Sequence, residues 1–291
     1  MKIIGVLPNK NYNNFFNNCP FVDAWIVNIK GLSFSHFNNF SVKELEELLN
    51  FQDKKYILNL EKIYSEDEII EVQKFIKKYK KYHNVYFSYS DLGTLQMLND
   101  EGVKNTIYHA STMITNLEDT EISIEENQLF IMGKEISYDE ICYIDNHLSK
   151  KIGIDAFGKF PIFYSKRHLL TTYFDYRKYQ NLPDELNYSL VEEFRNDEYP
   201  ITEQEETLVY EPFFYVLGSE LKSFSKIEWI VIHNEFLDND VYEKILKLYY
   251  EFLTNDFVCQ NGLSIEENIS MYVPTYKGKL EEKTILRKGE K

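Results

Sequence analysis

The densest group of side chains that could do chemistry is formed by four adjacent residues, Ser165, Lys166, Arg167 and His168. They lie in the segment FGKFPIFYSKRHLLTTYF, residues 157–174, just past a predicted β-strand. An Arg guanidinium presents a rigid fork of N–H donors that matches a carboxylate or a phosphate. Arg167 and Arg195, with Lys166 beside them, could therefore clamp a small anion such as a dicarboxylate.

Two carboxylates offer an alternative use for these arginines. Either Arg167 or Arg195 could form a structural ion pair with Glu135 or Glu203, and the residues favour neither reading over the other. Glu135 follows a predicted strand, so it is also a candidate general base or a partner that orients Arg167. Glu203 remains a candidate ligand-binding residue.

A serine nucleophile would need a positioned base, and Ser165 with His168 is the candidate pair. The segment lacks the G-x-S-x-G elbow that presents such a serine, and the chain has no H-E-x-x-H metal motif. The six histidines are scattered, so no metal site is predicted. His109 and His233 each lie near the end of a predicted strand and could reach the same end of the fold, although such histidines more often satisfy a local hydrogen bond.

Polar residues also follow the predicted strand 105–110, in the segment HASTMITN. Thr112 and Asn116 could bind a ligand through hydrogen bonds. Alternatively, Thr115 or Asn116 caps the next helix, which is the commoner role of these residue types.

The three cysteines, Cys19, Cys142 and Cys259, are far apart and have no CxxC spacing. This pattern predicts neither a disulfide framework nor a zinc site, and a reducing compartment fits it best. We expect small buried apolar residues at these positions and no cofactor.

The net charge of −15 argues against a protein that binds nucleic acid by itself, because affinity for phosphates comes largely from Lys and Arg. The basic run at 74–83 ends a predicted helix, where lysines favour the helix dipole, and is expected to be a solvated face. The apolar run 3–7 is too short for a signal peptide or a membrane span. A cytoplasmic location without membrane contact is therefore expected.

Short apolar runs alternate with amphipathic segments, which is typical of a parallel sheet with crossover helices. The predicted strands are 2–7, 24–29, 55–60, 84–89, 105–110, 128–133, 152–158 and 227–236. Eight strands predict an α/β fold, a parallel eight-stranded TIM-like barrel. The predicted helices are 41–51, 65–82, 91–100, 115–127, 137–148 and 240–253.

Three segments interrupt this alternation. The first crossover, 8–23, is short and Asn-rich, which predicts an abbreviated or missing helix. A polar, Tyr-rich stretch at 176–226 is expected to be an inserted subdomain before the last strand of a barrel domain spanning 1–255. Residues 256–291 have weak periodicity and are expected to wrap around the barrel as a C-terminal tail.

Five segments in order resemble peptidase family U32, the collagenase-like proteases, and in particular its short members. They are SDLGTLQ (90–96), HASTMITN (109–116), GKEISYDEI (133–141), residues 157–174, and EFRNDEYPITEQEETLVY (193–210). The most specific part is the pattern G-x-x-P-x-x-x-S-x-R-x-x-L-x-x-x-F from Gly158 to Phe174, followed by R-x-x-x-Y-P-I from Arg195.

The resemblance implies a barrel and kinship with proteins named for proteolysis, several of which act instead in RNA or quinone hydroxylation. In those hydroxylation proteins, cysteines around this pattern hold an iron–sulfur cluster, often in a heterodimer of paralogues. Here Pro161 and His168 stand where such cysteines commonly occur. One His does not replace four thiolate ligands, so this chain is not expected to hold a cluster.

Three functions follow as hypotheses. The first is a cluster-less accessory subunit that helps a paralogous U32 partner, itself carrying the cluster, in tRNA uridine hydroxylation at the wobble position. In that case tRNA would be reached only through the partner. The second is a peptidase, and the third is a non-catalytic barrel that binds a small carboxylate.

Overall fold

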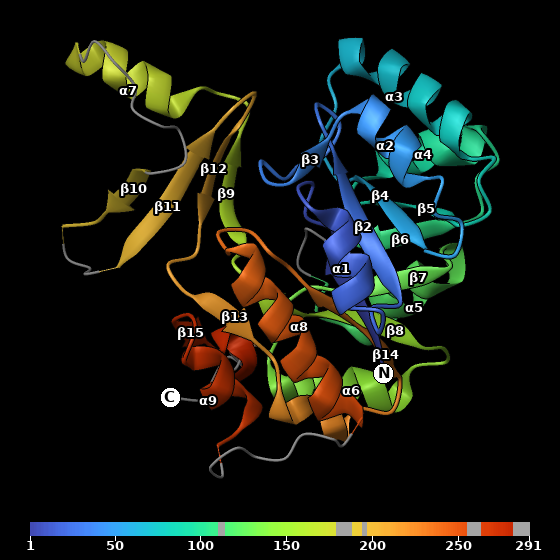
Figure 1. Ribbon diagram of the computed structural model, residues 1–291, viewed down its shortest axis with the longest axis vertical. Coiled ribbons are helices and arrows are strands. Elements are labelled where there is room, and N and C mark those ends of the chain that lie inside the picture. Colours follow the sequence, from blue (N-terminus) through green and yellow to red (C-terminus); the bar gives the residue numbers. More distant parts are fainter. Residues whose placement is uncertain (110–113, 179–187, 194–196, 255–262, 282–291) are drawn as a thin grey trace.

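Eight parallel strands close into a barrel in the computed structural model, which describes residues 1–109, 114–178, 188–193, 197–254 and 263–281 (Figure 1). The strands of the ring are β1 (Lys2–Val6), β2 (Ala24–Ile29), β4 (Tyr56–Leu60), β5 (Val85–Tyr89), β6 (Thr106–His109), β7 (Leu129–Met132), β8 (Ile152–Gly158) and β14 (Ile227–Ile232). Each lies within a predicted range, so the predicted barrel is confirmed. β14 pairs with both β1 and β8, and this double pairing closes the ring.

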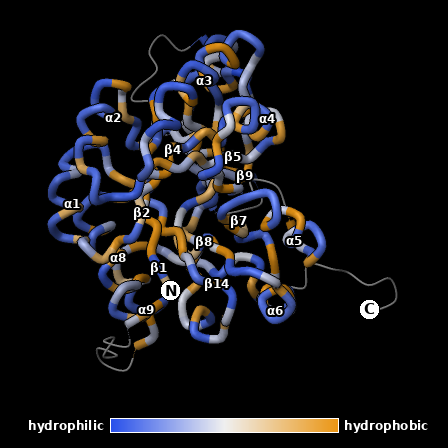
Figure 2. The backbone as a smooth tube through the Cα atoms, turned by 90° about the vertical axis from the view of Figure 1, so that its right-hand side faces the viewer, coloured by the Kyte–Doolittle hydropathy of each residue, from blue (hydrophilic) through white to orange (hydrophobic). Residues whose placement is uncertain are grey.

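Two hydrophobic clusters form because side chains alternate along each strand. The inward-facing residues fill the barrel as Ile4, Val6, Ala24, Ile26, Ile57, Ile107, Ile131 and Val231. The outward-facing residues pack against the helices in a larger cluster that includes Trp25 and Tyr56. Figure 2 shows hydrophobic residues gathered along the central strands, with mixed hydropathy on the surrounding helices.

Helices follow most of the ring strands and cover the outside of the barrel (Figure 1). They are α1 (Tyr12–Asn18), α2 (Val42–Leu48), α3 (Glu66–Tyr79), α4 (Leu92–Asp100), α5 (Leu117–Glu126), α6 (Tyr138–His147) and α8 (Asn239–Thr254). Capping boxes at Ser41, Ser65 and Ser137 begin three of them. The first crossover holds only the seven-residue α1, as its short Asn-rich sequence predicted.

α8 is tied to the strands by a buried hydroxyl. The Tyr242 hydroxyl accepts a hydrogen bond from the Val6 backbone N–H at 2.8 Å and donates to the Ile232 carbonyl at 3.0 Å. The same side chain therefore secures both β1 and β14, the pair that closes the ring.

A second, antiparallel sheet projects from the barrel between β8 and β14 (Figure 1). Its strands are β9 (Pro161–Ser165), β10 (Tyr188–Val191), β11 (Glu198–Glu203) and β12 (Thr207–Tyr210), in the order β10-β11-β12-β9. The helix α7 (Leu169–Arg177) connects β9 to β10. β9 and α7 both begin before residue 176, where the sequence pattern placed the start of the insertion, so the projecting sheet includes part of the 157–174 segment.

Further short elements complete the sheet of the barrel. β3 (Asn39–Phe40) pairs with β2, and β13 (Phe214–Val216) pairs antiparallel with the end of β8. Before β14 comes the 3-10 helix η1 (Ser219–Ser223). In the tail, β15 (Thr275–Tyr276) adds to β13 between α9 (Ile265–Ser270) and the 3-10 helix η3 (Gly278–Glu281). No helix in the described ranges is both long and apolar enough to span a membrane.

The projecting sheet meets the barrel at the loop after β2. His36 in this loop is buried, and its Nδ1 lies 2.7 Å from Thr202 Oγ1 of β11. The Gln204 side chain donates to the His36 carbonyl at 3.2 Å. Burial, assisted by the positive charge of Lys62 and opposed by Glu205, lowers the pKa of His36 from 6.5 to about 4.

We expect His36 to make this contact acid-sensitive. The unfolded chain takes up a proton near pH 6.5, whereas folded His36 resists protonation until about pH 4, so stability falls as the pH is lowered through this window. Between pH 7 and pH 4.5 the loss amounts to about 2 kcal/mol. Urea unfolding of the wild type and of His36→Asn at both pH values measures it. Equal losses in the two proteins would contradict the prediction.

Candidate active site

Polar side chains occupy the last inward-facing positions of the barrel strands. Ile107 points into the barrel, and His109 follows it by two residues on β6. Val231 also points into the barrel, and His233 follows it by two residues, just beyond the end of β14. Asp155 lies opposite Val231 on β8. The period of two along each strand therefore brings these three side chains together at the carboxyl end of the barrel, where barrel enzymes carry their active sites.

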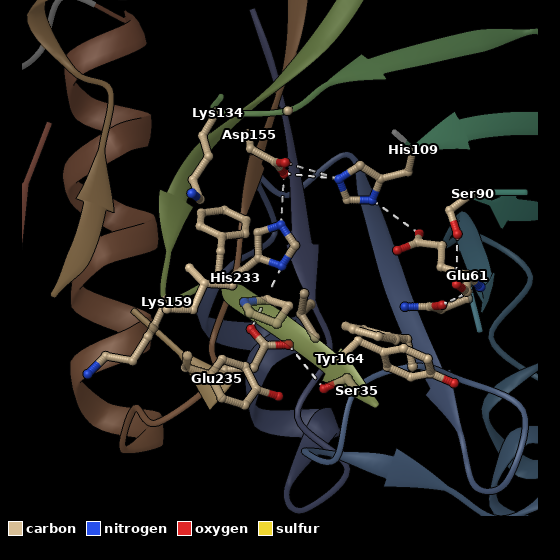
Figure 3. Close-up of a pocket in the computed structure, with 18 of the residues that line it drawn as sticks. Ser35, Glu61, Ser90, His109, Lys134, Asp155, Lys159, Tyr164, His233 and Glu235 are labelled. Atoms are coloured by element: carbon tan, nitrogen blue, oxygen red, sulfur yellow. Dashed lines mark hydrogen bonds and ion pairs between the residues drawn. The ribbon is translucent and has the colours of Figure 1, made fainter. Parts of the chain in front are cut away.

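Both imidazoles contact the same carboxylate, as Figure 3 shows. His109 Nε2 lies 3.1 Å from Asp155 Oδ1 and 3.2 Å from Oδ2, and His233 Nε2 lies 2.8 Å from Oδ1. The two ring centroids are 5.9 Å apart. Asp155 is 4% exposed, so this group is held away from bulk water.

A second carboxylate stands behind each imidazole. Glu61 Oε1 lies 3.1 Å from His109 Nδ1, and Glu235 Oε2 lies 3.8 Å from His233 Nδ1. Ser35 Oγ donates to Glu235 Oε1 at 3.1 Å, so the loop after β2 supports this carboxylate. The result is a chain of alternating acid and imidazole groups, Glu61, His109, Asp155, His233 and Glu235 (Figure 3).

The alternating charges shift the pKa values of these groups. Burial disfavours protonation of His109, but Glu61 and Asp155 outweigh it and hold its pKa well above the ordinary value. Burial likewise opposes protonation of His233, whose pKa is nevertheless raised by Asp155 and Glu235. For Asp155, burial works against ionisation, yet the two imidazoles keep its pKa below the ordinary value. The centre therefore favours positive charge around a fixed carboxylate.

A cavity of about 350 Å³ opens above this cluster. Its floor includes His109, Asp155 and His233, and Figure 3 shows Tyr164 of β9 on the side opposite the cluster. The apolar part of its wall includes Ile26, Ile63, Ile114, Ile162, Phe163 and Tyr164. The projecting sheet thus supplies part of the wall through β9, while the barrel supplies the ionisable groups.

Gly158 keeps His233 in place because the two backbones approach closely. The His233 N–H donates to the Phe157 carbonyl at 2.8 Å, and a Cβ at position 158 would lie 2.6 Å from the His233 Cβ. Gly158→Ala should therefore displace His233 and cost about 2–3 kcal/mol of stability, the upper part of the range for core overpacking. Gly102→Ala is the control, because a Cβ there meets nothing within 4 Å although the positive φ of 70° remains. Chemical unfolding compares the two, and equal costs would refute the steric argument.

In the structure, residues 165–168 lie away from this cluster. Ser165 ends β9 and pairs with Thr207 of β12, and its Oγ accepts a hydrogen bond from the Arg167 N–H. Lys166 Nζ contacts Glu68 at 3.3 Å on the surface. His168 precedes α7 with a half-exposed side chain, 3.8 Å from Glu203. None of these four residues is among those that line the cavity.

Glu203 stabilises the beginning of α7. Its carboxylate accepts hydrogen bonds from the Leu170 and Thr171 N–H groups and from the Thr207 hydroxyl. These contacts lower its pKa despite the opposing effect of burial. Capping of α7 therefore explains why the Glu203 carboxylate is buried at this position.

The remaining predicted residues have separate places. Glu135 lines the cavity and forms an ion pair with Lys134 at 2.5 Å. Asn116 caps α5 by accepting a hydrogen bond from the Asp119 N–H, which confirms the capping alternative. Thr112 and Arg195 lie outside the described residues, so the anion clamp of Arg167 with Arg195 stays a prediction.

Sequence reasoning brought His109 and His233 to the same end of the barrel but missed Asp155, Glu61 and Glu235. The missed signal was the two-residue period with which side chains along a strand point into the barrel. Asp155 is a single charge inside the apolar run IGIDAFG, and Glu235 follows His233 by two residues. A charged residue on the inward phase of a barrel strand is expensive to bury and indicates a site.

The described residues do not fit an iron–sulfur cluster. None of their thiols lines the cavity, where Pro161 contributes to the wall. Of the described cysteines, Cys142 lies on α6, and burial, with help from Glu243, raises the pKa of Cys19 after α1 to about 12. A protonated, buried thiol is not a cluster ligand.

A model of peptidase family U32 matches residues 27–234, a range that includes His109, Asp155 and His233. The chain belongs to peptidase family U32. No curated protein matches it. Among solved structures, orotidine 5′-phosphate decarboxylase from Thermotoga maritima is similar, with 14% identity, a TM-score of 0.35, and coverage of 54% of this chain and 79% of that chain.

Proposed function

We propose that this U32 barrel binds one small organic molecule in the cavity and acts on it at the cluster of His109, Asp155 and His233. The observation that carries the proposal is the shared carboxylate, which lies within 3.2 Å of both imidazoles at the floor of the cavity. Imidazole and carboxylate groups in such contact are the usual agents of general acid–base chemistry. Apolar walls above a polar floor are typical of small-molecule sites.

The size of the cavity supports a small molecule over a polypeptide. Its volume of about 350 Å³ lies near the lower end of the range known for small-molecule sites. The Ser165 hydroxyl, the candidate nucleophile of a peptidase, contacts the Arg167 backbone and does not line this cavity. We therefore favour a small substrate over the proteolysis that the family name suggests.

Binding is tested with a bacterial metabolite extract dialysed against the purified protein, followed by mass spectrometry of the retained compounds. Ile162→Trp should reduce retention at least tenfold, because the indole fills the cavity from β9. Leu190→Trp on β10, at the opposite edge of the same sheet, is the matched control, since both positions are about half exposed and only Ile162 lines the cavity. Retention that is unaffected by Ile162→Trp would sink the proposal.

The same assay separates this site from the predicted anion clamp. Arg167→Ala should leave retention unchanged, because Arg167 does not line the cavity. Loss of small carboxylates in Arg167→Ala alone would instead support the third hypothesis, a non-catalytic barrel that binds an anion on its projecting sheet.

An accessory role in tRNA uridine hydroxylation is a second proposal. It is supported by the family and by the described part of the cavity wall, which contains no thiol and so leaves any cluster to a paralogous partner. The charge of −15 agrees with tRNA contact through that partner. Deleting the gene should remove hydroxyuridine from digested tRNA, measured by mass spectrometry. Unchanged hydroxyuridine would refute this role.

A further inference from the structure

Three donor atoms converge at the floor of the cavity in a pattern that suits a metal ion. His109, Asp155 and His233 each offer one ligand atom, and these atoms all lie within 4.8 Å of one another. Two imidazoles and one carboxylate are ligands that divalent transition metals accept, and this set leaves further coordination positions open.

The contacts have the separation that a bound ion would require. An ion about 2.1 Å from each donor places neighbouring donors about 3 Å apart when they are at right angles. Asp155 Oδ1 lies 3.1 Å from His109 Nε2 and 2.8 Å from His233 Nε2. All three donor atoms lie within 4.8 Å of one another, so the side chains would rotate to surround an ion.

The carboxylates behind the two imidazoles also support a metal site. Histidines that bind metals commonly donate their other ring N–H to a carboxylate, which fixes the ring orientation. Glu61 occupies this position for His109 at 3.1 Å from Nδ1. Glu235 occupies it for His233, and its Oε2, 3.8 Å from Nδ1, is buried without a hydrogen-bond partner among the described residues. If the His233 ring turns toward Glu235 when the ion binds, its Nδ1–H can donate to this oxygen. Such a movement explains why the oxygen is buried beside the ring without a partner.

We propose that His109, Asp155 and His233 bind one divalent transition-metal ion, with Glu61 and Glu235 orienting the two imidazoles. The ion faces the cavity, so its open positions are available to an oxygen of the small molecule, such as a carboxylate. This role in the reaction rests on the function proposed above, whereas binding of the ion itself does not.

A second group of acidic side chains already has a positively charged side chain among its carboxylates. Glu68, Glu205 and Glu206 also bring ligand atoms within 4.8 Å of one another. Lys62 Nζ already lies among them, at 2.7–2.8 Å from each carboxylate. Its ammonium supplies the positive charge, so we assign no ion to that group.

The test is equilibrium dialysis of EDTA-treated protein against Zn²⁺, with the metal counted by mass spectrometry, and a Co²⁺ titration followed by visible absorption. The wild type should bind one ion per chain. Asp155→Asn and His233→Ala should weaken binding at least 100-fold, and Glu61→Gln should weaken it roughly tenfold, as loss of an orienting carboxylate does. His147→Gln is the control, because His147 is an exposed histidine on α6 and should leave binding unchanged.

Thermal unfolding separates loss of binding from loss of folding. Saturating Zn²⁺ should raise the Tm of the wild type and of His147→Gln, but not that of folded Asp155→Asn. Failure of the wild type to bind Zn²⁺ or Co²⁺, or full binding by Asp155→Asn, would overturn the metal site. If metabolite retention persists in EDTA, the proposed function survives that failure. An ion bound without any retained metabolite would refute the proposed function instead.

Discussion

Asp155→Asn should lower the turnover number of the retained metabolite by about 10²–10⁴-fold, the range of acid–base contributions by positioned side chains. Asp155 is the one group that contacts both His109 and His233 in the cluster. The amide preserves the shape but removes the negative charge that orients and balances the two imidazoles. Steady-state kinetics on a converted compound gives the measurement, and the fall should appear in kcat.

Glu203→Gln provides the matched control for this prediction. Glu203 is also a buried carboxylate, but it holds the beginning of α7 and does not line the cavity. Its amide variant should keep kcat within about twofold of the wild type, once the folded fraction is taken into account. A large loss of kcat in Glu203→Gln with little loss in Asp155→Asn would reverse our assignment of the site.

Lys62→Met should destabilise the protein by about 3 kcal/mol, because it breaks a buried ion network. The Lys62 side chain is 2% exposed and contacts Glu68 of α3 and both Glu205 and Glu206, between β11 and β12 of the projecting sheet. Burial opposes its charge, but the three carboxylates raise its pKa above the ordinary value. Without Lys62, the buried Glu206 loses its counter-charge. Glu205 is mostly exposed and adds little.

The double variant Lys62→Met/Glu206→Gln tests the cause. If the cost arises from an unpaired buried charge, removing that charge should restore at least about 1 kcal/mol of the lost stability. Urea unfolding at pH 7 gives all three free energies. A cost below about 1 kcal/mol for Lys62→Met would mean that solvent screens the network as it does surface ion pairs.

The barrel could be predicted from the sequence because its signal is local. Each ring strand is an apolar run bounded by polar residues, and α3 carries its own cap and charge pattern. The start of the insertion was harder to predict. Residues 161–165 continue the apolar character of β8, yet Gly158 and Pro161 redirect the chain into β9 of a separate sheet.

The candidate site could be predicted only in part, because its members are distant in the sequence. His109 and His233 were placed together by their positions at strand ends, whereas Asp155 required the phase of side chains along β8. Lys62 and Glu206 are 144 residues apart and meet only when the projecting sheet folds against the barrel. Such pairing depends on tertiary geometry, which no local pattern encodes.

The most direct test of the proposed site is a crystal structure of the protein with the metabolite retained from the extract. We predict electron density for the compound in the cavity, between the floor formed by His109, Asp155 and His233 and the wall formed by β9. Density beside Lys166 and Arg167 on the projecting sheet, with the cavity filled only by water, would contradict the assignment.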